Sequence, residues 1–211
     1  MVKDNTYVYL DHLLAFDICR PLEDLSWLVI SPEIHSPLQA SVWATELSDH
    51  PDKAYVKYIL QGISNGFRIG FDRRQHISSA SGNLHIDKPE AVTEYLQREV
   101  LLGRMWKIPL TILPRGVHIS PLGMIPKKNK PGKWRLIVDL SSPHGSSIND
   151  GIDTDRSSLS YASVDHLAAL VVSTGRGCFL VKADIKEAYR MVPVHPQDQH
   201  LLGVQWESAV Y

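Results

Sequence analysis

The sequence predicts an α+β fold in which a helical N-terminal region precedes a β-rich region. Two segments of the first half, residues 51–65 and 89–103, repeat apolar residues at the spacing of an amphipathic helix. Short apolar runs at 122–128 and 133–140 then flank a Pro-Gly turn. This change from helical to strand-like patterning along the chain predicts the α+β class.

The composition is that of a globular protein, but its charges are unevenly distributed. The 211 residues are enough to bury a core, with 44% hydrophobic and 21% charged residues and a formal net charge of −1. The stretch from Arg98 to Arg135 holds nine basic residues and a single acid, Glu99, so it carries +8 and the remainder −9. This asymmetry indicates either a strip that faces a polyanion or a solvated basic face, and charge alone does not separate the two.

The cysteines and the first residues indicate an intracellular protein, cytoplasmic or nuclear and not secreted. Cys19 and Cys178 lack the spacing of a metal site or a disulfide pair, which fits a reducing compartment. Charges interrupt the N-terminus as they do not in a signal peptide. No window approaches the roughly 18 apolar residues of a membrane span. No membrane partner is expected, and the sequence leaves the oligomeric state open.

Start and stop signals define the first predicted helix. Pro51, behind Asp49, suits the first helical position, and Asn65-Gly66 suits a left-handed end.

A polar segment rich in Ser and Gly, residues 72–88, then predicts a linker. The predicted boundary lies within this linker. Residues 1–82 form an N-terminal helical extension that includes most of the linker, and residues 83–211 form the second region. The second helix begins at Pro89 and ends near Gly103. Its apolar face consists of Val92, Tyr95, Leu96 and Val100.

The runs 122–128 and 133–140 predict an antiparallel hairpin with a lysine-rich tip, NKPG. Such a hairpin folds Lys128 of the first strand back near Arg135 of the second. Lysine offers a point charge and arginine a planar fork, and both suit phosphate oxygens. The alternative is a basic tip kept in water for solubility. It explains the lysines, but it explains less well why Arg135 lies inside an apolar strand.

A third helix and two strands are predicted further along. Ser163 suits the cap of the helix and Gly175 its end. Residues 178–184 and 201–207 predict strands.

The apolar run that begins at Phe179 ends on an acid, Asp184. A strand that ends in a carboxylate can place a metal ligand at the rim of a sheet, where the sheet is no longer covered. A tight turn after it would bring Tyr189 beside the same opening. The alternative is that Asp184 only caps the turn that follows.

Two signatures occur in order along the second half: GMIPKKNKPGKWRLIVDLS followed by SIND, and LVKADIKEAYRMVPVHP. Together they resemble the fingers and the first palm motif of reverse transcriptases (RNA-directed DNA polymerases) of LTR and DIRS-like retrotransposons. The motif-level similarity covers residues 118–211. The segments DKAYVKYILQGISNGFRIGF and KPEAVTEYLQREVLLGRM also resemble the part that precedes the polymerase in DIRS-like elements. The resemblance implies a helical N-terminal region, a polymerase-like fingers hairpin and an incomplete palm sheet.

The resemblance also implies a chemistry, the transfer of a nucleotide onto a primer 3′-hydroxyl. Asp184 matches the first catalytic aspartate, a ligand of both Mg²⁺ ions, and the Ile185 carbonyl assists at one of them. Two metal ions are suited to this reaction because they activate the attacking hydroxyl and neutralise the leaving oxygen. The implied partners are an RNA or DNA template-primer and a deoxynucleoside triphosphate.

Other positions match residues that hold the nucleotide and the nucleic acid. In the family, fingers cations grip the triphosphate, turn amides approach it, and an aromatic residue under the sugar disfavours a 2′-hydroxyl. The nucleotide-binding positions implied here are Lys128, Arg135, Glu187, Ala188 and Tyr189. The nucleic-acid-binding positions are Lys127, Lys130 and Lys133.

In this family the palm continues with a hairpin that bears a paired Asp-Asp, and no such pair follows Asp184 before Tyr211. The chain is therefore expected to be a fragment that is inactive alone. One alternative is a non-catalytic remnant that binds nucleic acid through the basic hairpin. Another is a gene fragment that folds poorly.

Two structural expectations follow from the resemblance. Lys128 and Arg135 should point into one concavity with Asp184, and Tyr189 should lie on its floor. The apolar strand at 179–184 should keep an unpaired edge or a bare apolar face, which would make the isolated chain poorly soluble.

Overall fold

A computed structural model of the chain describes residues 36–128, 130–158, 160–185 and 187–211. The described residues all belong to one compact unit. Cys19 and the first part of the predicted N-terminal extension lie outside them. The described residues contain both helices and short strands, in separate runs along the chain, so the predicted α+β class is confirmed. The predicted division between residues 82 and 83 stays a prediction.

A four-stranded sheet has the strand order β1-β6-β5-β2. Its strands are β1 (Ile108–Pro109), β2 (Ile119–Ser120), β5 (Gly203–Trp206) and β6 (Ala209–Val210). β5 confirms the strand expected at 201–207, and it pairs antiparallel with β6 and parallel with β2. Residues near the C-terminal end of the chain therefore form the centre of the sheet.

A two-stranded hairpin of β3 (Leu122–Pro126) and β4 (Trp134–Val138) confirms the predicted antiparallel pair. Its register sets Met124 opposite Leu136 and Ile125 opposite Arg135. Successive side chains of a strand point to opposite faces, so the first pair lies on one face and the second pair on the other. Met124 and Leu136 are buried, whereas Ile125 and Arg135 are exposed.

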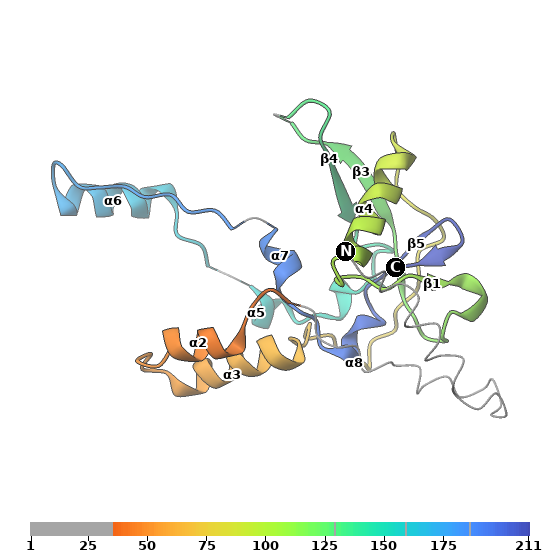
Figure 1. Cartoon of the computed structure of the whole chain (residues 1–211), viewed down its shortest axis with the longest axis horizontal. Helices are drawn as coiled ribbons and strands as arrows, with labels where there is room; N and C mark the ends of the chain where they lie inside the picture. Colours follow the sequence, from red (N-terminus) through yellow and green to blue (C-terminus); the bar gives the residue numbers. More distant parts are fainter. Residues whose placement is uncertain (1–35, 129, 159, 186) are drawn as a thin grey trace, which may run out of the picture. The chain divides into compact units, whose positions relative to one another are not determined.

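Helix α4 (Pro89–Leu101) packs on the buried face of the hairpin, as Figure 1 shows. It begins at Pro89 as predicted, because proline's fixed φ and missing N–H suit the first turn of a helix. Val92 and Leu96 of the predicted apolar face are fully buried, in one cluster with hairpin residues and Val204. Burial of one such side chain contributes roughly 1.5–3 kcal/mol. The hydrophobic core of the described residues lies at this contact.

The end of α4 folds back on the helix. Gly103 adopts the left-handed conformation with φ 68°. Arg104 then donates its N–H to the Glu99 carbonyl at 2.9 Å, and Leu102 donates to the Arg98 carbonyl at 3.0 Å. This pattern is a left-handed helix end that satisfies the last carbonyls. It brings the Arg104 side chain beside that of Glu99.

Residues 72–88 are irregular, as their composition indicates, but they are held against the strands. The Ala80 N–H donates to the Ile119 carbonyl at 2.8 Å and the Leu84 N–H to the Leu122 carbonyl at 2.9 Å. The Asn83 side chain donates to the Gln205 carbonyl at 3.0 Å. The polar side chains of this segment thus contribute to its attachment.

Helices α2 (Ala40–Glu46) and α3 (Lys53–Asn65) contact each other. The expectation that α3 begins at Pro51 is wrong by two residues. The Asp52 carboxylate accepts the Tyr55 N–H at 2.9 Å, so Asp52 is the cap and Pro51 lies before it. The left-handed end at Gly66, with φ 82°, is confirmed.

The end of α3 is attached to a later part of the chain. The Phe67 N–H donates to the Pro193 carbonyl at 2.8 Å, and the His195 N–H donates to the Phe67 carbonyl at 2.9 Å. A side chain at Gly66 would collide with the backbone of Val194 and His195, so glycine is required by space as well as by φ.

Helix α6 (Val164–Thr174) has the predicted ends. The Ser163 hydroxyl accepts the His166 N–H at 3.2 Å in a capping box, and Gly175 has φ 91°. None of its residues is buried among the described residues. The chain returns along α6 through residues 179–185 (Figure 1).

The strand expected at 178–184 is not formed. The segment is extended, but no neighbouring strand hydrogen-bonds to it among the described residues, and a strand requires such a partner. Phe179 and Val181 are 98% and 92% exposed. The expected bare apolar face is therefore observed, without the expected strand.

Short elements complete the described residues. They are η2 (Leu110–Ile112), η3 (Asn149–Gly151), α5 (Thr154–Ser157), α7 (Ala188–Met191) and α8 (Pro196–Gln199). Among the described residues, no helix combines the length and the apolar character that crossing a membrane requires. The predicted compartment stays a prediction.

Candidate nucleic-acid interface

The exposed face of the β3–β4 hairpin carries basic side chains. The Lys127 N–H donates to the Lys133 carbonyl at 2.8 Å, which continues the ladder one pair beyond Pro126 and Trp134. By strand alternation, Lys127, Lys133 and Arg135 share the face opposite to that of Met124 and Leu136. One face of the hairpin therefore packs on α4, while the other presents cations to solvent.

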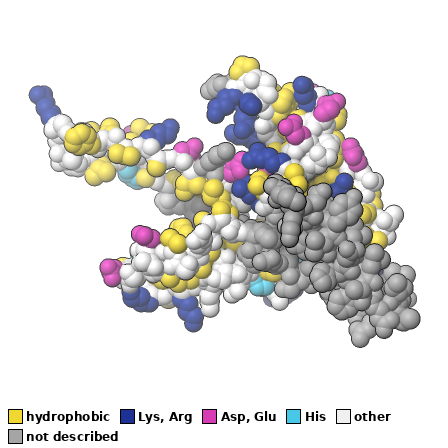
Figure 2. Space-filling model, in the orientation of Figure 1, with side chains coloured by type: hydrophobic (Ala, Val, Ile, Leu, Met, Phe, Trp, Pro, Cys, Tyr) yellow, Lys and Arg dark blue, Asp and Glu magenta, His cyan; other side chains and the backbone are white. Residues whose placement is uncertain are grey.

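The tip of the hairpin is a tight turn that adds further lysines. The Lys130 N–H donates to the Lys127 carbonyl at 3.1 Å, and the Lys133 N–H donates to the Lys130 carbonyl at 3.0 Å. Gly132 has φ 73°, a conformation that most other residues avoid. Lys128 lies in this turn and is exposed. Figure 2 shows Lys and Arg side chains gathered over the hairpin.

The register modifies one detail of the sequence prediction. The hairpin brings both Lys128 and Arg135 to its exposed parts. Arg135 lies opposite Ile125, however, and Lys128 lies in the turn beyond Lys127. The lysines that share a strand face with Arg135 are therefore Lys127 and Lys133, and Lys128 belongs to the tip.

Trp134 lies on the opposite, core-facing side of the hairpin from Arg135. Its ring is half-buried against the core, and the Lys88 ammonium lies 5.9 Å from the ring centroid. A cation over an aromatic face is attracted by the ring quadrupole. Lys88 therefore adds one more positive charge beside the hairpin.

A second cationic site lies at the end of α4. The Glu187 carboxylate bridges two arginines, with Oε1 2.6 Å from Arg98 Nη2 and Oε2 2.8 Å from Arg104 Nη1. Hydrogen bonds from Arg104 and then Arg98 lower the pKa of Glu187 from 4.5 to about 2. The Arg190 guanidinium lies 5.5 Å from the Tyr95 ring centroid nearby. Residues of α4 and of the α7 region thus form one network of charges.

Glu99 lies on the buried side of this network, next to Arg104. It is buried, and its carboxylate lies 3.7 Å from Arg104 Nη1. Its Oε2 atom accepts no hydrogen bond. Arg104 therefore contacts one acid from the helix that precedes it and one, Glu187, from a distant segment.

The residues implied as catalytic and nucleotide-binding around Asp184 lie at the surface. Asp184 and Ile185 are exposed, Ala188 is half-buried, and Tyr189 is 94% exposed. Glu187 is half-buried because its side chain turns towards α4. Of these residues, Glu187 is the one that the structure attaches to a cationic site.

No hydrogen bond or ion pair joins Asp184 to Lys128 or Arg135 in the part of the chain that the structure describes. All three side chains are exposed. The predicted convergence of these residues on one concavity, with Tyr189 on its floor, stays a prediction.

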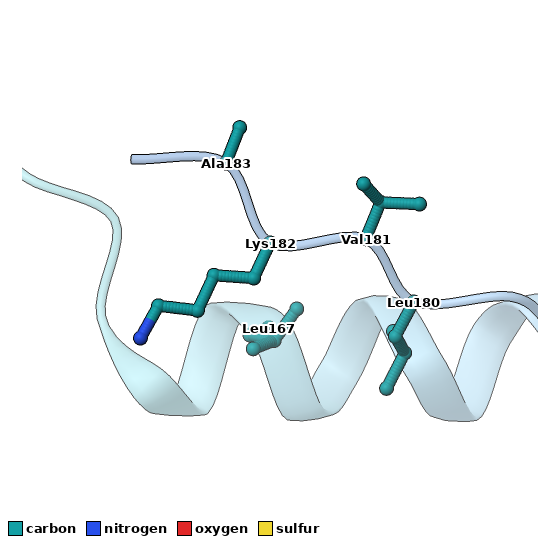
Figure 3. Close-up of a pocket in the computed structure, with 5 residues that line it drawn as sticks. All are labelled: Leu167, Leu180, Val181, Lys182 and Ala183. Carbon is teal, nitrogen blue, oxygen red and sulfur yellow. The ribbon is translucent and has the colours of Figure 1, made fainter. Parts of the chain in front are cut away.

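The segment that leads to Asp184 forms a shallow hollow with α6. Figure 3 shows Leu180 and Lys182 pointing towards α6 while Val181 and Ala183 point away. Leu167 of α6 completes the lining. The alternation is that of an extended chain. This hollow is mostly apolar and has one lysine, so it carries no constellation suited to catalysis.

The described residues do not by themselves fit a magnesium centre. Mg²⁺ prefers several oxygen ligands, usually including one or two carboxylates. Among residues 36–211, apart from the three positions left undescribed, no group of three His, Cys, Asp or Glu side chains could hold a metal ion. Asp184 and the Ile185 carbonyl would need further ligands.

Another charge cluster escaped prediction from the sequence. Arg68 donates to both oxygens of buried Asp198, at 2.7 and 2.9 Å, and the Ile69 N–H donates to it at 3.0 Å. Burial alone raises the pKa of Asp198, but these hydrogen bonds outweigh it and the pKa is lowered. The cluster attaches the chain after α3 to α8 and has a structural role.

Two buried polar atoms on the β2 segment lack hydrogen-bond partners, namely His118 Nε2 and Ser120 Oγ. Burial lowers the pKa of His118, which favours the neutral imidazole. Positions 118 and 120 lie on the same side of an extended chain. No sequence signal pointed to this pair.

No family model, curated protein sequence or solved structure matches the chain.

Proposed function

We propose that the chain is a region of a reverse transcriptase whose basic hairpin binds phosphate groups of nucleic acid or of an incoming nucleotide. The observation that carries the proposal is the two-faced hairpin. One face is buried on α4, and the other presents Lys127, Lys133 and Arg135 to solvent beside a tip with Lys128 and Lys130. A rigid base beneath a row of cations suits phosphate binding, because the cations are positioned before the ligand arrives.

The order of the sequence motifs supports the polymerase assignment. The hairpin motif is followed by the segment with Asp184, as the resemblance requires. In the proposed site Lys128 and Arg135 would bind the triphosphate, Asp184 and the Ile185 carbonyl would supply two of the ligands of a metal ion, and Tyr189 would lie under the sugar. Bound Mg²⁺ would stabilise charge on the transferred phosphate. Nucleotide transfer needs carboxylates in addition to Asp184, so phosphate binding is the activity proposed for these residues themselves.

A second candidate is a nucleic-acid-binding protein without catalytic activity. The observation that favours it is that no metal-binding group of side chains is found among the described residues, although the basic face is well formed. The two candidates share the hairpin and differ at Asp184.

Binding to a fluorescently labelled oligonucleotide over a series of salt concentrations tests the hairpin. We expect weak, sequence-independent binding, on the order of 10⁻⁴–10⁻⁶ M, that falls steeply with salt. Replacing Lys128 and Arg135 together by alanine should weaken binding to every sequence about equally. It should also flatten the salt slope by about 0.7–0.9 for each phosphate that the protein no longer neutralises.

The matched control replaces Lys57 and Arg176 by alanine. Both are exposed and lie outside the hairpin, and the double change removes the same charge. If both double variants weaken binding equally, the effect is one of net charge and the hairpin site is wrong. Binding that is absent, or indifferent to salt, would support a gene fragment that lacks either function.

Primer extension separates the two candidates. With Mg²⁺ or Mn²⁺ we expect no extension above background by the chain alone, because Asp184 and one carbonyl leave two metal ions short of the oxygen ligands that they need. Asp184→Asn should leave oligonucleotide binding unchanged or slightly tighter, since it removes a negative charge. Extension that Asp184→Asn abolishes would contradict the non-catalytic candidate and show that the remaining ligands come from elsewhere.

A further inference from the structure

Two guanidinium groups converge on a single carboxylate at the end of α4. Arg98 and Arg104 each take one oxygen of Glu187, at 2.6 and 2.8 Å. A phosphate group offers the same kind of oxygen pair, together with a further oxygen and more charge. Arginine forks bind carboxylate and phosphate in the same geometry. The pair of arginines is therefore suited to an anion larger than the one it holds.

The arginines are the fixed half of this contact. They lie on and just after α4, whose Val92 and Leu96 are fully buried in the core. Arg104 is mostly buried, and it is held from below by Glu99 and by the folded-back helix end. Arg98 is half exposed, so a ligand from solvent can reach it. The site would thus persist if Glu187 left.

Glu187 is the replaceable half. It has φ 56°, a left-handed conformation that is unfavourable for a residue with a side chain. It follows residues 179–185, which are exposed and extended. Segments with few buried contacts separate from the rest of a protein at low cost. Ion pairs that water can reach also contribute little to stability.

We infer that Arg98 and Arg104 form a phosphate-binding site, which Glu187 fills in this conformation and which a phosphate group of a nucleotide or of nucleic acid can take over. The site is separate from the hairpin and does not depend on the proposed function. Arg190, beside Tyr95, supplies a third cation nearby. Binding of a phosphate would release the start of α7 from α4, because Glu187 makes the ion pairs between them.

Titration of the full chain with inorganic tripolyphosphate tests this site. Glu187→Gln keeps the size of the side chain but removes the competing charge. We expect it to bind tripolyphosphate about fivefold more tightly, the order of the free energy that solvent-accessible ion pairs contribute. The control is Glu94→Gln, which removes an exposed acid from α4, the helix that carries Arg98. It should change the affinity for tripolyphosphate less than about twofold.

A second comparison distinguishes a phosphate site from a purely structural role, in which Glu187 acts only as a tether between the start of α7 and α4. In an Arg98→Ala background, Glu187→Gln should tighten binding by a clearly smaller factor, because one of the two phosphate ligands is gone and Glu187 competes for Arg104 alone. Both proteins in that comparison lack the Arg98–Glu187 ion pair, so a general loss of stability affects them alike. A gain of the same size without Arg98, or an equal gain from Glu94→Gln, would overturn the proposal and leave Glu187 as a tether.

The same variants distinguish the source of the phosphate. If Glu187→Gln tightens the binding of a deoxynucleoside triphosphate but not of a single-stranded oligonucleotide without a terminal phosphate, the site binds nucleotides. The reverse assigns it to the nucleic-acid backbone. The hairpin variant with Lys128 and Arg135 replaced should keep the gain caused by Glu187→Gln. Failure of the hairpin proposal and failure of this one therefore give different results.

Discussion

Helices α4 and α6 are of similar length, yet their environments differ completely. In α4, Val92 and Leu96 are fully buried against the β3–β4 hairpin. In α6, Leu167 and Val172 are 52% and 81% exposed, and no residue is buried among those described. Figure 2 shows hydrophobic side chains at the surface along α6 and the returning segment.

The difference shows that the ends of a helix and its burial have separate causes. α6 has the more complete caps, a capping box at Ser163 and a left-handed glycine at Gly175. α4 has no side-chain cap at its start. Caps define where a helix begins and ends, but helices of this length are marginal in water without packing. We therefore expect α4 to hold the stability of the fold and α6 to contribute little to it.

The largest expected effect tests this comparison directly. Leu96→Ala should lower the free energy of unfolding by about 2–5 kcal/mol, because it leaves a cavity in the core. Leu167→Ala, the same change on α6, should stay within about 0.5 kcal/mol of the unchanged protein. Urea denaturation followed by circular dichroism measures both. Equal losses would mean that α6 packs against something that its exposure does not reveal.

A smaller effect concerns association between molecules. Residues 179–185 are extended, carry exposed apolar side chains and pair with no strand among the described residues, which favours aggregation. Replacing Phe179 and Val181 by lysine should reduce self-association in size-exclusion chromatography without lowering the melting temperature. Adding two lysines at exposed Ser81 and Ser160 is the control for charge alone. A monodisperse unmodified chain that melts cooperatively would contradict the expectation of poor solubility.

The smallest expected effect depends on pH. Because the folded state lowers the pKa of Glu187 from 4.5 to about 2, its ion pairs stabilise the fold above the ordinary pKa. That contribution is lost as the pH falls from 4.5 towards 2. Glu187→Gln should therefore melt slightly below the unchanged protein at neutral pH, and the difference should vanish in this acid range. The Glu94→Gln control should show no such convergence, and its appearance there would contradict the assignment to Glu187.

Local signals in the sequence predicted the elements that depend on local chemistry. Pro89 and Gly103 bound α4, Ser163 and Gly175 bound α6, and the Pro-Gly turn joins the hairpin. Each of these signals acts within a few residues through φ or a cap. They are visible without any knowledge of tertiary contacts.

Contacts between distant segments were not predictable in the same way. Strands β1, β2 and β6 have two residues each, too few to show a period. Residues 178–184 have the pattern of a strand, but the pattern cannot state whether a partner strand is present.

In the candidate site too, the parts that depend on local signals were predictable and the parts that depend on distant contacts were not. The sequence predicted the basic hairpin, because the Pro-Gly turn and the β-rich runs on both sides of it are local signals. The bridge from Glu187 to Arg98 and Arg104 joins residues 89 and 83 positions apart, and no local signal in the sequence pointed to it. The convergence of Asp184 with Lys128 and Arg135 also depends on distant contacts, so it remains to be tested.

The strand order of the four-stranded sheet has a consequence for folding during synthesis. Its central strands, β5 and β6, are made after β1 and β2, and Ile108 must wait for Val210 to pair. The β3–β4 hairpin joins residues close in sequence and can form as soon as β4 has been made. Closing long loops is slow compared with forming local pairs. The order of events on the ribosome should therefore be hairpin and α4 first, and the sheet last.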